Sequence, residues 1–324
     1  MTDKKISVIV VTYNQEATIG RALDSILAQD FELPYEIVVG DDASTDGTRA
    51  ILEEYRKNYP DIIRLRLLPV NRGVRENYIT CLLDCHGRYI ADCAGDDFWT
   101  DKTRLRRQYE MMENDPTLSV VHTAWDYYNE TSGERTPGDP DGKRAPYCEP
   151  IADGRNLLPA IVGHFNHLTI HLCTALYRFD RFMEAYIEDP ELFRYPRYTC
   201  EDLQLSAVLA ASGRVAFMPE STLCYSVGGD SVSHSKDPRR EFEYFWGVMK
   251  LTRRLQQKFN IEDQHVQPYY DRIIDHMSAI ALRLNDRVLL ADIDRLEVPR
   301  TVKSRLLSNQ TVWNVARAVK SKMQ

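Results

Sequence analysis

The first hundred residues alternate between short apolar runs and amphipathic stretches, which limits the folds open to this chain. Residues 6–11 form an apolar, largely β-branched run, typical of a strand buried on both faces of a sheet. Apolar residues then recur at helical spacing from Ile19 to Leu27. Further strands are predicted at 36–39, 62–68 and 89–93, with helical segments between them. This alternation predicts an α/β fold: a mostly parallel sheet flanked by helices.

The rest of the chain predicts a second group of elements and a helical appendage. Residues 131–150 are rich in Gly, Pro, Asp and Arg without periodicity, which indicates a loop, either a solvated insertion or a lid. From Asp237 the pattern is helical to the end. We therefore divide the chain into a domain at 1–235 and a helical region at 236–324. Other predicted strands lie at 118–123, 172–177, 215–218 and 223–227, and other predicted helices at about 102–112, 153–162 and 203–209.

Composition excludes several protein classes. Hydrophobic residues make up 43% and charged residues 27%, as in ordinary globular proteins. The net charge of −7 disfavours a nucleic-acid partner. Seven cysteines without a Cys-x-x-Cys pair indicate a reducing compartment. The sequence contains neither a signal peptide nor a bilayer-length apolar stretch, so we expect a cytoplasmic protein, with contact at the inner face of the membrane left open.

Acidic pairs follow two of the predicted strands. Asp41 and Asp42 follow the strand at 36–39, and Asp96 and Asp97 follow the strand at 89–93. The carboxyl ends of parallel strands meet at one sheet edge, where ligands of open α/β folds bind. Buried carboxylates are unfavourable unless they are paired or coordinated. The sequence therefore predicts a site for a divalent metal and a polar ligand at this edge.

A series of short motifs runs along residues 5–235. They are Val-Thr-Tyr-Asn-Gln-Glu at 11–16, Gly-Asp-Asp-Ala-Ser-Thr-Asp-Gly-Thr at 40–48, Asn-Arg-Gly at 71–73, Gly-Asp-Asp-Phe-Trp at 95–99, Glu-Asp at 201–202 and Gly-Asp-Ser-Val-Ser at 229–233. In this order the motifs resemble the family 2 glycosyltransferases. The resemblance implies the GT-A (Rossmann-like) fold and an inverting transfer of a sugar from a nucleotide diphosphate donor. It makes 1–100 the nucleotide-binding half and 101–235 the acceptor half.

The resemblance assigns a set of residues to the nucleotide donor. Tyr13 would cover the base with its ring. Asp42 would accept a hydrogen bond from the ring N–H of uracil or thymine. With Arg72 beside it we expect a UDP-sugar, and thymidine and guanosine donors stay open. The alternatives are ordinary capping roles for Thr12 and Asn14 and a turn role for Asp41. The full set is Thr12, Tyr13, Asn14, Glu16, Asp41, Asp42, Arg72, Gly73, Gly95, Asp96 and Asp97.

A divalent cation, Mn²⁺ or Mg²⁺, is the cofactor that the resemblance implies. Asp96 matches the last acid of the family's Asp-x-Asp motif, but Ala94 stands where its first acid would be. Asp92 could compensate, or it could hydrogen-bond the backbone as a buried strand residue. His234 is a second candidate metal ligand, or a surface histidine. A metal would neutralise the charge that develops on the leaving diphosphate.

The Glu-Asp pair at 201–202 is the candidate catalytic group. The resemblance makes Asp202 the base that takes a proton from the acceptor hydroxyl, with Glu201 orienting the acceptor. The alternative is that both acids only complement a helix dipole. On the acceptor side we place Trp99, which would stack on a sugar ring, and His171, with core packing as the alternative for both.

The last segment, 300–324, is basic in an otherwise acidic chain. Val312, Ala316, Val319 and Met323 share a predicted helical face, with Trp313 beside it. A basic amphipathic helix with an aromatic residue suits an anionic membrane surface. The alternatives are docking on its own domain or on a second copy in a homodimer.

The predicted function is thus sugar transfer to a glycan or lipid-linked glycan acceptor during surface polysaccharide biosynthesis. The alternative is a catalytically silent protein that binds nucleotide sugar or glycan. A phospho-accepting signalling domain would leave Glu201 and Asp202 without a role. A dinucleotide oxidoreductase is disfavoured because no Gly-x-Gly-x-x-Gly follows the first strand.

Overall fold

The first strand, β1 (Ile6–Thr12), lies inside a parallel group of four strands that forms one half of the sheet. The computed structural model describes residues 4–164, 169–228 and 237–321. The sheet order is β3-β2-β1-β4-β9-β6-β10-β5, with β7 paired to β6 and β8 to β10. The remaining strands are β2 (Tyr35–Asp41), β3 (Ile63–Leu67), β4 (Tyr89–Ala94), β5 (Phe98–Trp99), β6 (Leu118–Asn129), β7 (Arg135–Pro137), β8 (Ile151–Asp153), β9 (Leu176–Arg178) and β10 (Arg214–Val227).

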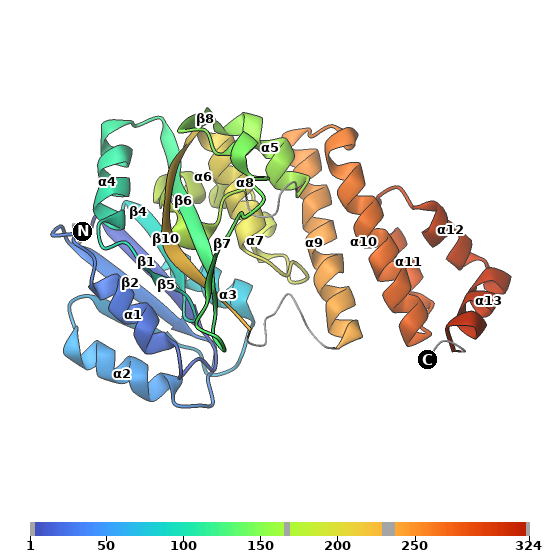
Figure 1. The fold of residues 1–324 in the computed structure, drawn as a ribbon, viewed down its shortest axis with the longest axis horizontal. Coiled ribbons are helices and arrows are strands. Elements are labelled where there is room, and N and C mark those ends of the chain that lie inside the picture. The colour runs from blue at the N-terminus through green and yellow to red at the C-terminus, as the bar shows by residue number, and fades with distance from the viewer. Residues whose placement is uncertain (1–3, 165–168, 229–236, 322–324) are drawn as a thin grey trace.

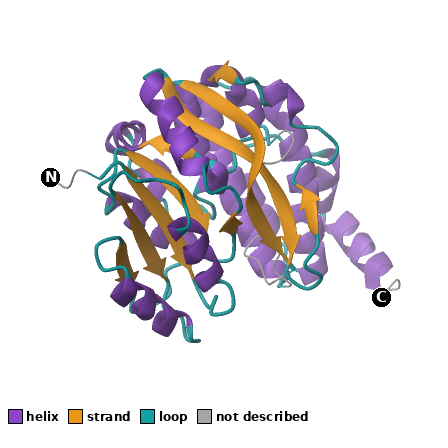
Figure 2. Cartoon of the chain, turned by 60° about the vertical axis from the view of Figure 1, so that its left-hand side comes forward, coloured by secondary structure: helices purple, strands orange, loops and turns teal. Residues whose placement is uncertain are grey.

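Helices cover both faces of this sheet, as Figures 1 and 2 show. The α/β fold with a helical C-terminal region is therefore confirmed. The helices are α1 (Ile19–Leu27), α2 (Thr48–Asn58), α3 (Val74–Leu83), α4 (Arg104–Asn114), α5 (Gly154–Val162), α6 (Phe179–Glu188), α7 (Glu191–Arg194), α8 (Asp202–Ser212), α9 (Pro238–Phe259), α10 (Asp263–Leu284), α11 (Val288–Asp294), α12 (Val302–Ser308) and α13 (Gln310–Ser321).

The second half of the sheet is mixed rather than parallel. Strand β9 runs antiparallel to both β4 and β6, whereas β6 and β10 are parallel to each other. The segment expected as one strand at 172–177 is a 3-10 turn (Leu172–Thr174) followed by β9. The two strands expected at 215–218 and 223–227 are one strand, β10, with register shifts after Met218. Pro219 follows that residue and has no N–H to donate, so the ladder is interrupted there.

Alternate residues of β1 enter different hydrophobic clusters, as expected for a strand buried on both faces. Val8 and Val10 pack with residues of α1, α2 and α4, whereas Ile9 packs in the cluster on the opposite face. That second cluster combines α3, α5, α6 and α8 with the C-terminal helices, as far as Leu307 and Trp313. The appendage visible on the right of Figure 1 therefore shares its hydrophobic core with α8.

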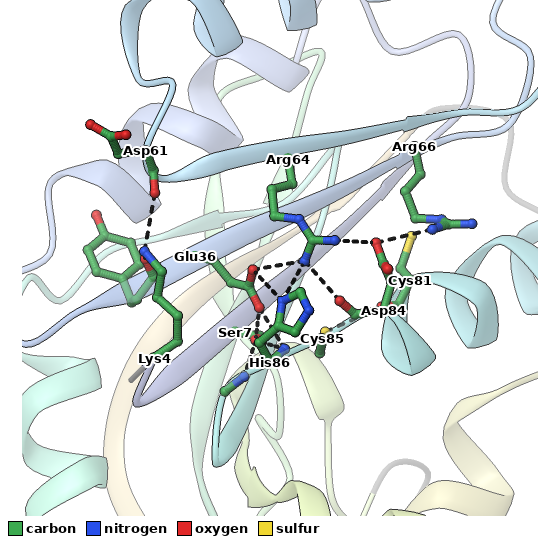
Figure 3. A network of polar contacts seen from close by, with 12 residues as sticks. Lys4, Ser7, Glu36, Asp61, Arg64, Arg66, Cys81, Asp84, Cys85 and His86 are labelled. Carbon is green, nitrogen blue, oxygen red and sulfur yellow. Dashed lines mark hydrogen bonds and ion pairs between the residues drawn. The ribbon is translucent and has the colours of Figure 1, made fainter. Parts of the chain in front are cut away.

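A buried carboxylate ties the amino ends of β1, β2 and β3 together, at the end of the sheet opposite the acidic pairs. Glu36 is 2% exposed and accepts hydrogen bonds from Ser7 Oγ at 2.7 Å, Arg64 Nη1 at 2.9 Å and the His86 backbone N–H at 2.7 Å. Figure 3 shows these groups converging on Glu36. Burial raises the pKa of Glu36, but the hydrogen bonds from Ser7, Arg64 and His86 outweigh it and hold the pKa below its usual range.

Replacing Glu36 with alanine is expected to lower the free energy of unfolding by about 3 kcal/mol at pH 7, because Ser7 and Arg64 lose a buried partner. A carboxyl with a lowered folded-state pKa stabilises the fold above its unfolded pKa, and this stabilisation is lost as pH falls through the folded pKa. The difference between wild type and Glu36→Ala should therefore shrink below about pH 4. Urea denaturation over this pH range measures it.

The matched control is Asp30→Ala, which removes an exposed partner of Arg106. Exposed ion pairs contribute less than about 1 kcal/mol, so this change should leave the urea midpoint nearly unchanged. A Glu36→Ala protein as stable as Asp30→Ala would show that the network in Figure 3 does not hold the strand ends.

Candidate active site

The carboxyl ends of β1, β2 and β4 lie level with one another at one edge of the sheet. Thr12 pairs with Asp41 of β2, and Val11 pairs with Ala94 of β4. Just beyond the strands, the Asp42 N–H donates to the Thr12 carbonyl and the Gly95 N–H donates to the Val11 carbonyl, both at 3.0 Å. The first residues of the two acidic loops are thus anchored to β1. The structure brings the predicted acidic pairs to this common edge.

The loops after β1 and β2 hold each other in place. Asn14 Oδ1 accepts the Thr45 N–H at 2.8 Å, and the Asn14 N–H donates to Ser44 Oγ at 2.9 Å. Glu16 Oε2 accepts the Gly47 N–H at 2.6 Å. Asn14 has a φ of 52°, a left-handed conformation that asparagine tolerates well. Asn14 and Glu16 therefore shape the loops, while the neighbouring Tyr13 ring, 46% exposed, faces solvent.

Asp41 is the last residue of β2, not a residue of the following loop as expected, and Asp42 follows it; both are buried but have different partners. Asp41 receives Arg49 Nε at 2.6 Å and the Ser44 N–H at 3.2 Å. Asp42 accepts the backbone N–H groups of Arg72 at 2.7 Å and Gly73 at 2.8 Å. Asp42 thereby fixes the 71–73 loop at the site, where the Arg72 side chain is exposed and Gly73 has a φ of 85°. A carboxylate has lone pairs left for one more N–H donor.

The loop after β4 presents one acid and buries the next. A Cβ on Gly95 would lie 2.4 Å from Gln15 Oε1 and 3.0 Å from Thr12 Oγ1, so the loop approaches β1 closely only with glycine there. Asp97 is 1% exposed and accepts the Ser226 N–H of β10 at 2.9 Å. Burial and the charge of Asp96 raise the pKa of Asp97 well above its usual range. Asp97 therefore attaches the loop to β10. The less buried Asp96 is the acid of this loop that a ligand can reach.

Asp96 has the electrostatic character of a cation ligand. Burial and the charge of Glu130 raise the pKa of Asp96, while Arg21 and a hydrogen bond from Gln15 oppose the rise. A bound cation would relieve both causes of the rise. Mg²⁺ and Mn²⁺ bind through one or two carboxylates together with substrate phosphates and waters. Asp96 thus fits a cation held partly by a diphosphate. Within residues 4–164, 169–228 and 237–321, no group of three or more His, Cys, Asp and Glu suits a metal.

Asp92 does not replace the acid missing at Ala94. Its Oδ1 accepts a hydrogen bond from Tyr78 at 2.9 Å, and the Tyr78 hydroxyl lies 2.8 Å from that of Tyr177. Burial raises the pKa of Asp92 to about 7. Of the two roles considered for Asp92, the structure thus supports a buried core residue, bonded to tyrosines instead of the backbone. The other candidate ligand, His234, lies outside the described residues.

Glu201 and Asp202 stand at the start of α8. Burial and the charge of Asp202 raise the pKa of Glu201 to about 8, with Arg75 opposing. Burial also raises the pKa of Asp202, against hydrogen bonds from the Leu203 N–H and the Cys200 thiol. Both groups therefore bind protons more readily than ordinary surface acids, the property expected of a general base working near neutral pH.

The loop after β4 meets β10 at Ser226, and Tyr225 precedes this residue. Burial, followed by the charge of Asp97, raises the pKa of Tyr225, and the more weakly felt charges of Asp96 and Asp202 act in the same direction. The position of Tyr225 after the register shifts of β10 is visible only in the structure.

The two residues expected on the acceptor side occupy different places. Trp99 is 4% exposed, packs in the core, and has the Arg104 guanidinium 4.1 Å from its ring centre, so the structure does not bring it to the open edge. His171 is 5% exposed, and its ring lies 5.3 Å from that of Tyr225. His171 thus lies directly behind a site residue.

Arg21 is a site residue that sequence reasoning missed. From α1 its Nη2 donates to the Asp96 carbonyl at 2.9 Å and to Ser226 Oγ at 3.2 Å, and it pairs with Glu130 at 2.5 Å. Its guanidinium also lies 4.3 Å from the Phe98 ring centre. Arg21 thus joins α1 to the loop after β4, to the residue after β6 and to β10. In the sequence it could not be told from an ordinary solvent-exposed arginine on an amphipathic helix.

Known proteins share part of this sequence. The model of the family described as glycosyl transferase family 2 matches residues 7–184. The uncharacterized protein Rv1520 of Mycobacterium tuberculosis is 41% identical over 115 residues, which are 36% of this chain and 33% of that protein. The putative teichuronic acid biosynthesis glycosyltransferase TuaG of Bacillus subtilis is 36% identical over 107 residues, 33% of this chain and 41% of TuaG. The matched stretches thus span less than half of these relatives.

The fold also resembles a solved structure along almost its whole length. S. aureus TarS 1-349, solved in complex with UDP-GlcNAc, superposes with a TM-score of 0.61, covering 98% of this chain and 92% of that one at 18% identity. The likeness at this identity concerns the fold, and it confirms the GT-A architecture expected from the motifs.

Proposed function

Because this chain belongs to glycosyl transferase family 2, we propose that it transfers a sugar from a nucleotide diphosphate donor, a UDP-sugar, to a glycan or lipid-linked glycan acceptor, with inversion at the anomeric carbon. The observation that carries the proposal is the common sheet edge at which the loops bearing Asp42 and Asp96 are both anchored to β1. Family relatives such as TuaG belong to polysaccharide biosynthesis, which supports a glycan acceptor.

The donor would lie across the carboxyl ends of β1, β2 and β4. Asp42, already holding the N–H groups of Arg72 and Gly73, would accept the N–H of a uracil ring. The exposed Tyr13 ring would cover the base. Asn14, Glu16 and Asp41 would act by holding the loops in shape.

Asp96 would hold the cation, Mn²⁺ or Mg²⁺, against the diphosphate. When bound, such a cation neutralises charge on the leaving diphosphate as a Lewis acid. Gln15 and Arg21 keep the Asp96 loop in place through the Asp96 carboxyl and carbonyl respectively.

Asp202 would remove the proton from the acceptor hydroxyl while its oxygen attacks the anomeric carbon from the face opposite the diphosphate. The carbon–oxygen bond to the acceptor forms, the bond to the diphosphate breaks, and the proton ends on Asp202. Attack from the opposite face inverts the anomeric centre. Glu201, with its pKa raised to about 8, would be largely protonated at neutral pH and could donate a hydrogen bond to the acceptor.

Donor turnover tests the proposal. The protein is incubated with a panel of UDP-, dTDP- and GDP-sugars and Mn²⁺, with and without EDTA, and nucleoside diphosphate release is measured. We expect slow release from one donor, abolished by EDTA. Binding of a nucleotide sugar without release, even with acceptor glycans present, would favour the silent binder; absence of both binding and release would contradict the proposal.

We also propose that α12 and α13 contact an anionic lipid surface. Val302, Leu306 and Val315 are 73%, 53% and 58% exposed, and Lys303 and Arg305 share α12 with the first two. Trp313, expected at the membrane side, instead is 2% exposed in the shared core. Among the described residues no helix is long and apolar enough to cross a membrane.

Replacing Val302 and Leu306 with serine is expected to lower binding to phosphatidylserine vesicles at least fivefold, because exposed apolar area and basic charge act together at an interface. Vesicle sedimentation, with phosphatidylcholine vesicles for comparison, measures it. Ile187→Ser, which changes an equally exposed apolar residue on α6, is the matched control. If the double variant instead converts a dimer to monomers with unchanged vesicle binding, the surface is a dimer contact.

A further inference from the structure

Behind Tyr225 lies a cluster of buried polar side chains that the reaction above does not use. Its members are His122 and Trp125 of β6, Arg144, Thr169 and His171, each 5% exposed or less. We refer to these five residues as the Arg144 cluster. The His171 ring lies 4.9 Å from that of Trp125 and 5.3 Å from that of Tyr225, so the cluster is continuous with the candidate active site.

Every member of the Arg144 cluster has a buried polar atom without a hydrogen-bond partner among the described residues. These atoms are both ring nitrogens of His122, Nε2 of His171, Nε1 of Trp125, Nε of Arg144 and Oγ1 of Thr169. Nearly all buried polar atoms in folded proteins have hydrogen-bond partners, and a buried polar atom without a partner destabilises the fold. So many together in one place indicate a site that binds a polar group.

Arg144 makes this site cationic. Its guanidinium lies 4.1 Å from the Trp125 ring centre, and its Nη2 donates to the Thr169 carbonyl at 3.1 Å. Among the described residues no carboxylate lies within ion-pair distance of it. The nearby Asp139 carboxylate instead accepts the backbone N–H groups of Lys143 and Arg144. A buried charge without a counter-charge is unfavourable, so binding of an anion next to the guanidinium would be stabilising.

The two histidines do not add to that charge. Burial, followed by the charge of Arg144, lowers the pKa of His122 and of His171 to about 3, so both rings are neutral at working pH. Each neutral ring still offers one N–H donor. Together with the guanidinium, the two rings give the cluster several hydrogen-bond donors and a single positive charge, which is the complement of a carboxylate or phosphate.

We propose that the Arg144 cluster is a subsite for the anionic group, carboxylate or phosphate, of an acidic acceptor glycan. This assignment rests on the proposed function, since it makes the cluster part of the acceptor site next to Tyr225. It narrows the acceptor to polymers that carry acidic sugars or phosphodiesters.

The segment that carries Arg144 also covers the cluster. The Gly138 N–H donates to the Trp125 carbonyl at 2.9 Å, and a Cβ on Gly138 would lie 2.4 Å from Trp125 Nε1, so the backbone lies directly on the indole. Residues 139–143 are mostly exposed. The exposed residues 139–143 are therefore all that separates this side of the cluster from solvent, and an acidic group would reach the guanidinium by displacing them while Arg144 stays in place.

Binding of defined oligosaccharides to the full chain tests the subsite. The probes are a galacturonate pentamer, the same pentamer with its carboxyls methyl-esterified, and a glycerol phosphate pentamer, titrated by calorimetry in the presence of UDP and Mn²⁺. We expect the wild type to bind at least one anionic probe about tenfold or more tighter than the neutral ester. The tighter of the two anionic probes then distinguishes a carboxylate from a phosphate.

Variants of Arg144 test whether the cluster causes the preference for anionic probes over the neutral ester. Arg144→Gln should lose the tenfold preference, and Arg144→Lys, which keeps the charge but not the fork of donors, should retain part of it. The matched control is Arg197→Gln, which removes another arginine stacked on a tryptophan, 3.5 Å from the Trp246 ring centre. It should bind all probes as the wild type does. The melting temperature of each variant confirms that it is folded.

Equal binding of acidic and neutral pentamers by the wild type, or no binding of any probe, overturns the subsite while donor turnover still stands. A folded Arg144→Gln protein that keeps the full preference also overturns it. Failure of the proposed function is seen separately, as absence of nucleotide-sugar binding and turnover.

Discussion

Replacing Asp202 with asparagine is expected to lower kcat for sugar transfer by about 10³-fold, with donor affinity nearly unchanged. General base catalysis contributes about 10²–10⁴-fold, and asparagine keeps the size of the side chain without accepting the proton. Removing a group that acts mainly in the transition state lowers kcat more than it changes KM. Steady-state kinetics with the donor found in the panel, beside a UDP titration, measures both.

The pH dependence of the wild-type activity is an independent test of Asp202 as the base. The base must be deprotonated to act, and burial raises the pKa of Asp202. The activity should therefore fall on the acid side at a pH above the usual aspartate value of about 4. Asp202→Asn should lack this limb in its residual activity.

Asp180→Asn is the matched control, since Asp180 is also an acid in the first turn of a helix, α6. If helix-dipole compensation were the whole role of Asp202, both variants would keep their activity and lose only a little stability. Equal kcat values in the two variants would remove Asp202 from the chemistry.

Replacing Asp96 with alanine should lower metal-dependent turnover by about 10²-fold or more, because a cation that stabilises a leaving diphosphate contributes several kcal/mol to the transition state. The apparent affinity for Mn²⁺ in the presence of UDP, followed by the electron paramagnetic resonance signal of free Mn²⁺, should fall with it. Asp126→Asn, which changes an acid of β6 ion-paired with Arg135 at 2.6 Å, should leave both quantities unchanged.

Asp96→Ala should also be no less stable than the wild type in metal-free buffer at pH 7. A carboxyl whose folded-state pKa is raised destabilises the fold at any pH where it is ionised in the unfolded state. Removing it therefore removes an unfavourable charge. Thermal melts in EDTA test this, and a large loss of stability would mean that Asp96 serves the fold rather than the cation.

Local patterns predicted the donor half of the fold well. The strands β1, β2, β3 and β4 each lie within two residues of the predicted bounds. Asp42 and Asp96 were placed at the sheet edge because each comes within two residues of the end of a strand that pairs in parallel with β1. Local periodicity therefore suffices to find these strands and the residues at their ends.

Contacts between distant segments escaped prediction. Strand β9 inserts antiparallel between β4 and β6, a pairing that no local pattern encodes. Strand alternation puts Asp92 and Ala94 on one face of β4. It could not predict that the Tyr78 hydroxyl, itself next to that of Tyr177, donates a hydrogen bond to Asp92, because both tyrosines come from other parts of the chain. Arg21 and Arg144 were missed for the same reason, since their partners are brought together only by folding.

The core shared by α8 and the C-terminal helices has a consequence for building chimaeras. Leu205 and Val208 of α8 pack in one cluster with Phe242, Trp246 and Met249 of α9. The helix that begins at Asp202 thus packs on a part of the chain beyond residue 184, where the family match ends. An exchange of α8 between relatives therefore has to include α9. A splice at residue 235 would leave α8 packed against helices from another protein.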